Sequence, residues 1–270
     1  MSPAAAKGLP APARVALLGL GEAGSAIAAD LIAAGVDVRG YDPKVEAPAG
    51  CAPRRDEADA VSDADLVLSV NSGQDAAPAL AAALAVLRPG VVWADLNTAS
   101  PGLKRQLAAT AADRGVLLAD VALLAPVPGR GLRTPMLMSG PGARRGAELL
   151  GSWGAVVEVV DGPPGVASSR KLLRSVFYKG LAAAVVEALE GASAAGVEDW
   201  LRDNIAEELA GFDRATLARL VDGTHTHARR RADELAAAAE QLRELGVRPR
   251  MTEAAHELLA DLRDHPRSGG

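Results

Sequence analysis

The sequence has little of what marks several common classes of protein. Cys51 is its single cysteine, so an internal disulfide is excluded and a cytoplasmic location is expected. Lys and Arg number 29 against 34 Asp and Glu, and a net charge of -5 does not provide the basic surface that nucleic acid requires. No apolar run is long enough to span a bilayer, so we expect no membrane partner. Aromatic residues make up only 3% of the chain, and the core must therefore be built from Ala, Val and Leu.

Two patterns divide the chain and predict two domains. Between residues 14 and 162, short β-branched or Leu-rich runs alternate with Ala-rich stretches, which is typical of a parallel sheet with crossover helices. Between residues 163 and 265 the β-branched runs stop, and Ala, Leu, Glu and Arg predict an all-α domain. Residues 1–13 lack the continuous apolar segment of a signal peptide, so we expect a disordered leader there.

The expected elements follow from these periodicities. The strands are Val15–Leu18, Val36–Tyr41, Leu66–Val70, Val91–Leu96, Val116–Ala119, Met136–Ser139 and Val156–Val160. The helices between them are Ser25–Ala34, Ala76–Leu87, Leu103–Ala112 and Ala143–Trp153. The helices of the second domain are Val166–Ala195, Val197–Leu209, Arg214–Val221, Thr224–Leu245 and Thr252–Arg263. The predicted fold class is a doubly wound α/β domain followed by an all-α domain.

A glycine-rich loop, Gly19-Leu20-Gly21-Glu22-Ala23-Gly24, lies between the first predicted strand and the first helix. A GxGxxG pattern is weak by itself, but this strand-turn-helix setting is the one that dinucleotide binding requires. Gly19 permits the tight turn, Gly21 lets a pyrophosphate approach the backbone, and Gly24 lets helix and strand pack closely. The helix N-terminus then faces the phosphates with free N–H groups. The first domain is therefore predicted to be a Rossmann fold.

The second predicted strand ends at Tyr41-Asp42, where a carboxylate accepts the ribose hydroxyls of NAD and repels the 2′-phosphate of NADP. This favours NAD, although Lys44 or Arg39 could weaken the repulsion and permit both cofactors. The alternative is a glycine turn with a solvated Asp. The predicted cofactor-binding residues from these segments are Gly19, Leu20, Gly21, Glu22, Ala23, Gly24, Tyr41, Asp42 and Asn71.

A lysine-bearing stretch opens the second predicted domain. Lys171, Ser175 and Lys179 recur every four residues, so they share one stripe of a helix. Oxidation of a carbinol requires a group that takes the hydroxyl proton, and a lysine in a partly apolar site can do this. Lys171 and Lys179 are the candidates, whereas the alternative for each is a lysine whose stem covers apolar neighbours.

The stretch Gly165-Val166-Ala167-Ser168-Ser169-Arg170-Lys171 resembles the β-hydroxyacid dehydrogenase superfamily, which includes 3-hydroxyisobutyrate and 6-phosphogluconate dehydrogenases. In that superfamily a lysine on the long interdomain helix, preceded by glycines and followed four residues later by Asn, is the catalytic acid/base. The resemblance implies this role for Lys171. Ser175 stands where the family has Asn, which normally bonds the substrate.

Two further segments carry the resemblance. Asp95-Leu96-Asn97-Thr98-Ala99-Ser100-Pro101 is similar to the family's Asp-x-Ser/Asn-Thr-x-x-Pro stretch, which implies that Asn97 and Thr98 lie beside the nicotinamide. Asp120-Val121-Ala122-Leu123-Leu124-Ala125-Pro126 corresponds to Asp-Ala-Pro-Val-Ser-Gly-Gly, whose last three residues hold the substrate carboxylate. Leu124, Ala125 and Pro126 take those substrate-binding positions here, without the hydroxyl and with one N–H fewer.

The segment from Thr224 to Glu234 resembles a poorly characterised branch of the family that has a phosphogluconate-dehydrogenase-like helical domain. On a continuous helix His227, Arg230 or Arg231, and Glu234 would share one face. We expect this face to meet the substrate cleft, with His227 assisting proton transfer and Arg230 binding an anionic substrate. The alternative is a solvated basic run paired with nearby Glu. No metal site is indicated, since His225 and His227 are two residues apart and point to different sides of a helix.

Taken together, the motifs predict an NAD(P)-dependent oxidoreductase that transfers hydride between nicotinamide and a small polar hydroxyacid or alcohol, or its carbonyl, with Lys171 relaying the proton. Imine reduction by the same two-domain architecture is one alternative, although related imine reductases usually replace the lysine. A non-catalytic dinucleotide-binding protein is another. The second domain is apolar enough that we expect a homodimer.

Overall fold

The computed structural model describes residues 13–265, so the predicted leader lies, apart from Ala13, outside the described residues. The chain forms two compact units, and the division falls inside a long helix, between Arg174 and Ser175. The helical region expected from residue 163 thus begins within the first unit. No helix of the described residues has both the length and the apolarity needed to cross a membrane.

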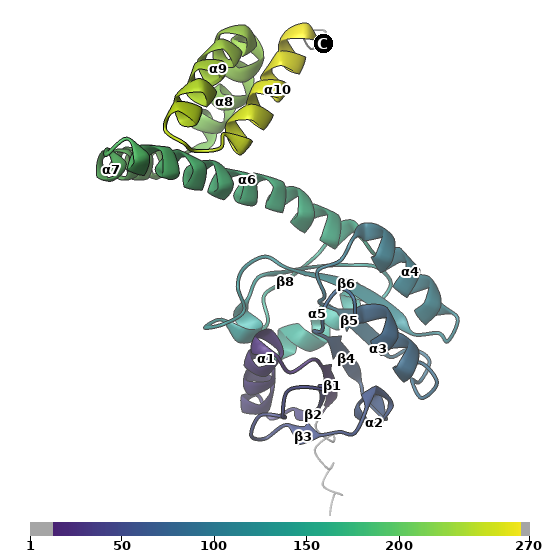
Figure 1. Ribbon diagram of the computed structural model, residues 1–270. Coiled ribbons are helices and arrows are strands. Elements are labelled where there is room, and N and C mark those ends of the chain that lie inside the picture. Colours follow the sequence, from purple (N-terminus) through teal and green to yellow (C-terminus); the bar gives the residue numbers. More distant parts are fainter. Residues whose placement is uncertain (1–12, 266–270) are drawn as a thin grey trace, which may run out of the picture. The chain divides into compact units, whose positions relative to one another are not determined.

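The first unit is built on one eight-stranded sheet with the order β3-β2-β1-β4-β5-β6-β7-β8 (Figure 1). Its strands are β1 (Arg14–Leu18), β2 (Asp37–Tyr41), β3 (Ala52–Pro53), β4 (Leu66–Ser69), β5 (Val92–Asp95), β6 (Leu117–Leu123), β7 (Met136–Ser139) and β8 (Val157–Val159). From β1 the chain adds β2 and β3 on one side, and from β4 it adds β5 and β6 on the other side, as in a doubly wound sheet.

One strand pairing departs from the expected parallel sheet. β7 runs antiparallel to β6, while the other neighbouring strands are parallel. The connection at residues 124–135 contains only the short 3-10 helix η1 (Gly131–Arg133), whereas a parallel return needs a longer crossover, usually a helix. The predicted doubly wound, mostly parallel sheet is confirmed, and β6 with β7 is its one antiparallel pair among the described strands.

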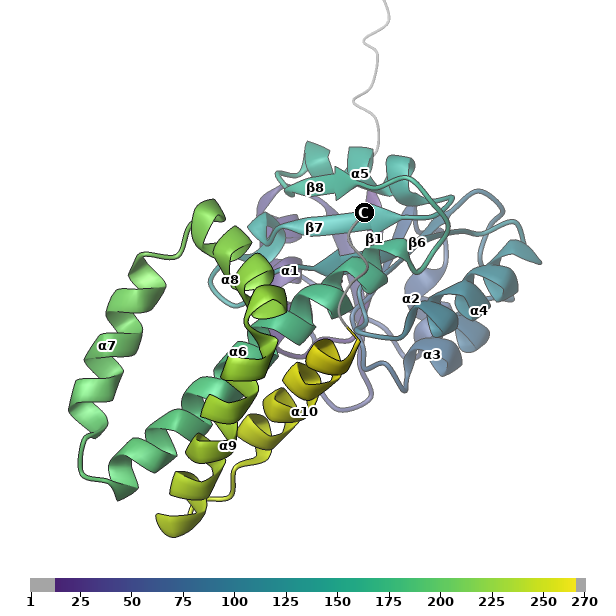
Figure 2. The same ribbon diagram turned by 90° about the horizontal axis from the view of Figure 1, so that it is seen from above.

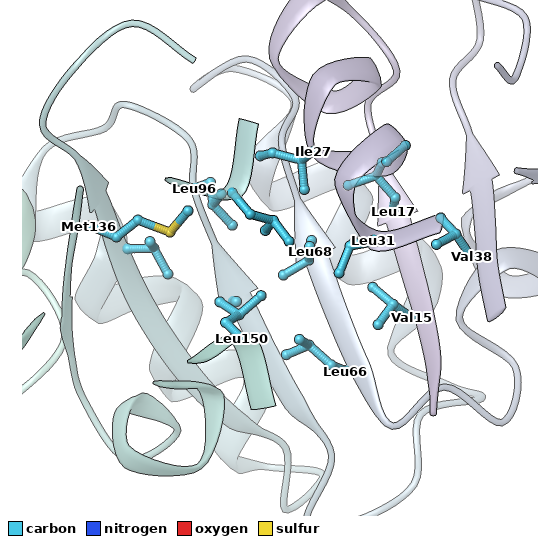
Figure 3. Close-up of a cluster of buried hydrophobic side chains, with 14 of the residues drawn as sticks. Val15, Leu17, Ile27, Leu31, Val38, Leu66, Leu68, Leu96, Met136 and Leu150 are labelled. Carbon is cyan, nitrogen blue, oxygen red and sulfur yellow. The ribbon is translucent and has the colours of Figure 1, made fainter. Parts of the chain in front are cut away.

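Five helices cover the two faces of this sheet: α1 (Glu22–Ala33), α2 (Glu57–Val61), α3 (Ala76–Ala83), α4 (Pro101–Ala112) and α5 (Ala143–Ser152). Successive side chains of a strand point to opposite faces, so β1 contributes to two cores. Val15 and Leu17 pack with Ile27 of α1 and with α5 (Figure 3). Ala16 and Leu18 belong to the second core, with α2, α3 and α4. Burial on both faces explains why the strands are continuously apolar.

The second unit is helical and consists of the later part of α6 (Val166–Ala194) with α7 (Glu198–Ala210), α8 (Arg214–Thr226), α9 (Ala228–Glu244) and α10 (Arg250–Asp264). Figure 2 shows α9 and α10 side by side. Glu187 of α6 accepts the N–H of Met251 at 2.8 Å and the N–H of Thr252 at 2.8 Å, so it caps the start of α10. Large apolar side chains, including Trp200 and Leu217, are exposed, and the homodimer stays a prediction.

The expected helix Thr224–Leu245 forms from Ala228 to Glu244, so its predicted start was wrong. His227 has φ −116° and ψ 23°, and its N–H bonds the carbonyl of Gly223, which closes the last turn of α8. A new helix begins at Ala228, with His227 as its N-terminal neighbour. His227 therefore lies at a junction, and the single helical face proposed for it with Arg230 and Glu234 does not form.

Candidate active site

The glycine loop has the geometry that a dinucleotide requires. Gly19 has φ +95°, and a Cβ there would lie 2.5 Å from the carbonyl oxygen of Val70. At Gly24 a Cβ would lie 2.0 Å from the carbonyl oxygen of Gly19, so helix α1 starts in direct contact with the turn. At Gly21 a Cβ would meet no atom within 4 Å. Gly19 and Gly24 are thus required by the fold, whereas Gly21 leaves open space, as a pyrophosphate against the backbone would need.

These differences predict opposite effects for two alanine substitutions in one loop. Gly21→Ala should leave the thermal unfolding midpoint unchanged and raise the Kd for NADH at least about tenfold, because its methyl group takes the space of the pyrophosphate. Gly24→Ala should destabilise the fold by about 1–3 kcal/mol, because its methyl group overlaps the Gly19 carbonyl. Calorimetry for binding and thermal melts for stability measure both. A Gly21→Ala protein that bound NADH normally would contradict this assignment of the phosphate site.

Asp42 follows β2 and is held by three backbone N–H groups. Its Oδ2 accepts the N–H of Leu20 at 2.8 Å, and its Oδ1 accepts those of Lys44 at 2.8 Å and Val45 at 3.0 Å. The carboxylate therefore joins the glycine loop to the end of the second strand. Arg39 does not line the cavities at this site, and its Nη1 donates to the carbonyl of Ser62.

A cavity of about 420 Å³ lies over this edge of the sheet. Five of the residues predicted to bind the cofactor line it: Gly19, Gly21, Tyr41, Asp42 and Asn71. Leu20 is buried, and Glu22 and Ala23 form the first turn of α1 after the N-cap Gly21. The described residues thus fit an adenine dinucleotide, with a glycine cradle, a helix N-terminus and a carboxylate around one cavity.

Asn97 and Thr98 follow β5 at the same edge of the sheet. Asn97 is buried; its Nδ2 donates to Ser69 Oγ at 2.9 Å, and its N–H donates to Asp95 Oδ1 at 2.9 Å. Thr98 is exposed, and its carbonyl oxygen would lie 2.7 Å from a Cβ on Gly73, so the loop after β4 presses against it. The two residues are held by neighbouring strand ends, with the Thr98 hydroxyl left at the surface.

Lys171 reaches Thr98. Its Nζ donates to Thr98 Oγ1 at 3.0 Å, across 73 residues of sequence. The helix that carries Lys171 is fixed by Asp120 of β6, whose Oδ2 accepts the N–H groups of Gly165 at 2.9 Å and Ser168 at 3.0 Å. A carboxylate at a helix N-terminus satisfies unpaired N–H groups and complements the helix dipole. The structure therefore joins two segments that the sequence suggested separately, the one around Thr98 and the one around Lys171.

Lys104 lies beneath this contact, and the sequence interpretation did not single it out. Its Nζ lies 3.2 Å from Asp95 Oδ1 and 3.3 Å from Asp120 Oδ1, and all three side chains are 0% exposed. Burial raises the pKa of Asp95, while the charge of Lys104 acts to lower it. The sequence did contain one indication that Lys104 is buried, because Lys104, Leu107 and Ala111 are spaced as the buried stripe of a helix.

The other predicted site residues are more scattered. Leu124, Ala125 and Pro126 lie in the connection after β6, where the N–H of Leu124 donates to the carbonyl of Pro135 at 2.9 Å. Ser175 and Lys179 follow Lys171 along α6, within the second unit. Arg230 forms an ion pair with Glu234, as the alternative of a solvated, paired basic run supposed.

Family comparisons agree with this division of the chain. Residues 14–133 match the NAD binding domain of 6-phosphogluconate dehydrogenase, and residues 192–262 match a domain of unknown function (DUF1932). A conserved hypothetical protein from Sinorhizobium meliloti 1021 is 31% identical; the match covers 96% of this chain and 91% of that one, with a TM-score of 0.61.

Two other relatives are more distant or partial. A probable 3-hydroxyisobutyrate dehydrogenase of Mycobacterium tuberculosis is 33% identical over 132 residues, or 47% of this chain and 45% of that protein. The chain thus matches about half the length of that dehydrogenase. An imine reductase from Aspergillus terreus, solved in complex with NADPH4, has a TM-score of 0.78 at 18% identity, over 94% of this chain and 95% of that one. A likeness at this identity shows the shared fold alone.

Proposed function

Because this chain belongs to the family that joins an NAD binding domain of the 6-phosphogluconate dehydrogenase type to a domain of unknown function (DUF1932), we propose that it is a nicotinamide-dependent dehydrogenase or reductase. Its substrate is a small polar hydroxyacid or alcohol, or the corresponding carbonyl compound. The observation that carries this proposal is the contact between Lys171 Nζ and Thr98 Oγ1 at 3.0 Å, on the unit that also holds the dinucleotide cavity.

The bound cofactor supplies the hydride acceptor or donor, and the chain's own residues handle the proton. In the oxidation direction Lys171 Nζ accepts the proton of the substrate hydroxyl, and in the reduction direction it returns that proton to the carbonyl oxygen. Thr98 Oγ1 accepts a hydrogen bond from Nζ and so restricts the orientation of the amine. Asp120 fixes the first turn of α6 and thereby the starting point of the lysine side chain.

A panel of substrates tests the reaction class. Hydroxyacids and alcohols with NAD⁺, and the matching carbonyl compounds with NADH, should change absorbance at the nicotinamide band. Cyclic imines with NADH form the second set of substrates. The fold shared with imine reductases supports imine reduction, whereas the retained Lys171 argues against it. Turnover of imines alone would replace the proposed reaction with imine reduction. NADH binding with no turnover anywhere in the panel would favour a non-catalytic dinucleotide-binding protein.

Cofactor preference is a separate expectation. The Asp42 carboxylate lines the dinucleotide cavity and would repel a 2′-phosphate, so kcat/KM with NADH should exceed that with NADPH by about tenfold or more, equal to about 1.4 kcal/mol. Lys44 lines the same cavity and offsets part of the repulsion. Steady-state rates with both cofactors and one substrate measure the ratio. Equal or reversed values would contradict the preference for NAD.

A further inference from the structure

Three charged side chains form a fully buried cluster inside the first unit. Lys104 Nζ of α4 donates to the carbonyl oxygen of Asp95 at 2.8 Å and also contacts the carboxylates of Asp95 and Asp120, at 3.2 and 3.3 Å. A charge removed from water is stable only when partners compensate it closely. Lys104 thus connects three elements: helix α4, the end of β5 and the middle of β6.

The two carboxylates that contact Lys104 are hydrogen-bonded to the two segments that carry Thr98 and Lys171. Asp95 Oδ1 accepts the N–H of Asn97, the residue before Thr98. Asp120 accepts the N–H and, at 2.6 Å, the hydroxyl of Ser168, which lies one helical turn before Lys171. The segment of Thr98 and the first turn of α6 are thus connected through Asp95, Lys104 and Asp120.

We propose that Lys104 is a positioning residue, whose buried amine ties the Asn97-Thr98 segment to the first turn of α6 and so sets the distance between Thr98 Oγ1 and Lys171 Nζ. This inference rests on the proposed function. Thr98 orients the Lys171 amine, and a displacement of a reacting group by about 1 Å can lower a rate about 100-fold. Lys104 is fully buried and so is not exposed to substrate or cofactor; it acts through Lys171.

The cluster itself supplies a matched background for the test. Asp95 Oδ2 has no hydrogen-bond partner, whereas Asp120 has several donors, so Asp95 is the less compensated carboxylate. Asp95→Asn leaves Lys104 and Asp120 as a balanced pair and keeps the carbonyl oxygen of residue 95 that Lys104 bonds. Adding Lys104→Met then removes the amine without leaving two buried carboxylates unopposed.

The experiment compares Asp95→Asn with Asp95→Asn/Lys104→Met in the full chain. We expect the double variant to lose about 10- to 100-fold in kcat relative to Asp95→Asn, with the Kd for NADH little changed and a smaller loss of stability than Lys104→Met causes by itself. Lys171→Met should then give the same residual rate in both backgrounds, because Lys104 acts only through Lys171. Lys104→Gln in the same background serves where the methionine variant does not fold.

A second measurement needs no turnover. Dimethylated lysines observed by NMR, with the Lys171 signal assigned by its absence in Lys171→Met, report the titration midpoint of that amine. This midpoint should differ between the two backgrounds, because the Thr98 contact changes. An unchanged midpoint together with unchanged kcat, or losses from Lys104→Met and Lys171→Met that simply multiply, would overturn the inference. Wild-type protein that turns over no substrate overturns the proposed function instead, and the NMR comparison still decides the positioning role.

Discussion

Lys171→Met should lower kcat by about 100- to 10,000-fold, the usual contribution of a positioned acid or base, and leave the Kd for NADH within about threefold. Methionine keeps the length and apolar contacts of the lysine stem but cannot hold a proton. The glycine loop, Asp42 and the cavity that they line belong to other segments, so cofactor binding should persist. Rapid-mixing kinetics on the best substrate of the panel, with NADH binding measured by fluorescence, separates the two effects.

Arg170→Met provides the matched control. Arg170 precedes Lys171 on the same helix, is exposed, and lies 4.0 Å from Glu158 in a surface ion pair. Such pairs contribute little to stability, so this variant should keep normal turnover and the same unfolding midpoint. Normal turnover in Lys171→Met would refute the proton-relay role, and equal losses in both variants would point to the charge of α6 rather than to one amine.

Lys104→Met by itself should lower the free energy of unfolding by about 3–5 kcal/mol, more than any other substitution proposed for this chain, because it leaves buried carboxylates without their cation. Urea unfolding monitored by circular dichroism measures the loss. Adding Asp95→Asn should recover a large part of it, since one of the two carboxylates is then neutral. A Lys104→Met protein as stable as its parent would mean that the buried cluster is not charged as described.

The stability deficit of Lys104→Met should also depend on pH, and its sign follows from Asp95. Burial raises the pKa of Asp95 above its ordinary value, and Lys104 opposes that rise. A carboxyl group whose pKa is higher in the folded protein than in the unfolded chain lowers the free energy of unfolding as pH rises. This loss begins at the pKa of the unfolded chain and is complete above the pKa of the folded protein. Without Lys104 the pKa of Asp95 rises further, so the pH range over which Asp95 destabilises the protein extends to higher pH. The deficit should therefore be smaller at pH 5 than at pH 7, and this pH dependence should be lost in the Asp95→Asn background.

Local patterns predicted much of the first unit. The run Val15–Leu18 and the glycines after it could be identified from sequence, because continuous apolar residues followed by GxGxxG specify strand, turn and helix within one short segment. Lys171 could be proposed from the resemblance, although its contact with Thr98 joins segments 73 residues apart and required the fold.

Features that depend on distant partners could not be predicted in the same way. The spacing of Lys104 with Leu107 and Ala111 indicates burial, but its partners Asp95 and Asp120 come from neighbouring strands and could not be inferred from that spacing. The reversal of β7 depends on a connection without a crossover α-helix, and that absence is hard to recognise in a loop rich in Gly and Pro. The break at His227 has no glycine or proline at that residue, and a hydrogen bond to Gly223 closes the turn instead.

The anchoring of α6 by Asp120 has a consequence for substitutions in the second unit. The helix is fastened at Gly165 and Ser168, and Lys171 lies before the boundary at Arg174, so the proposed proton relay travels with the cofactor-binding half. Substitutions from Ser175 onward therefore leave both anchors and the contact of Lys171 with Thr98 in place.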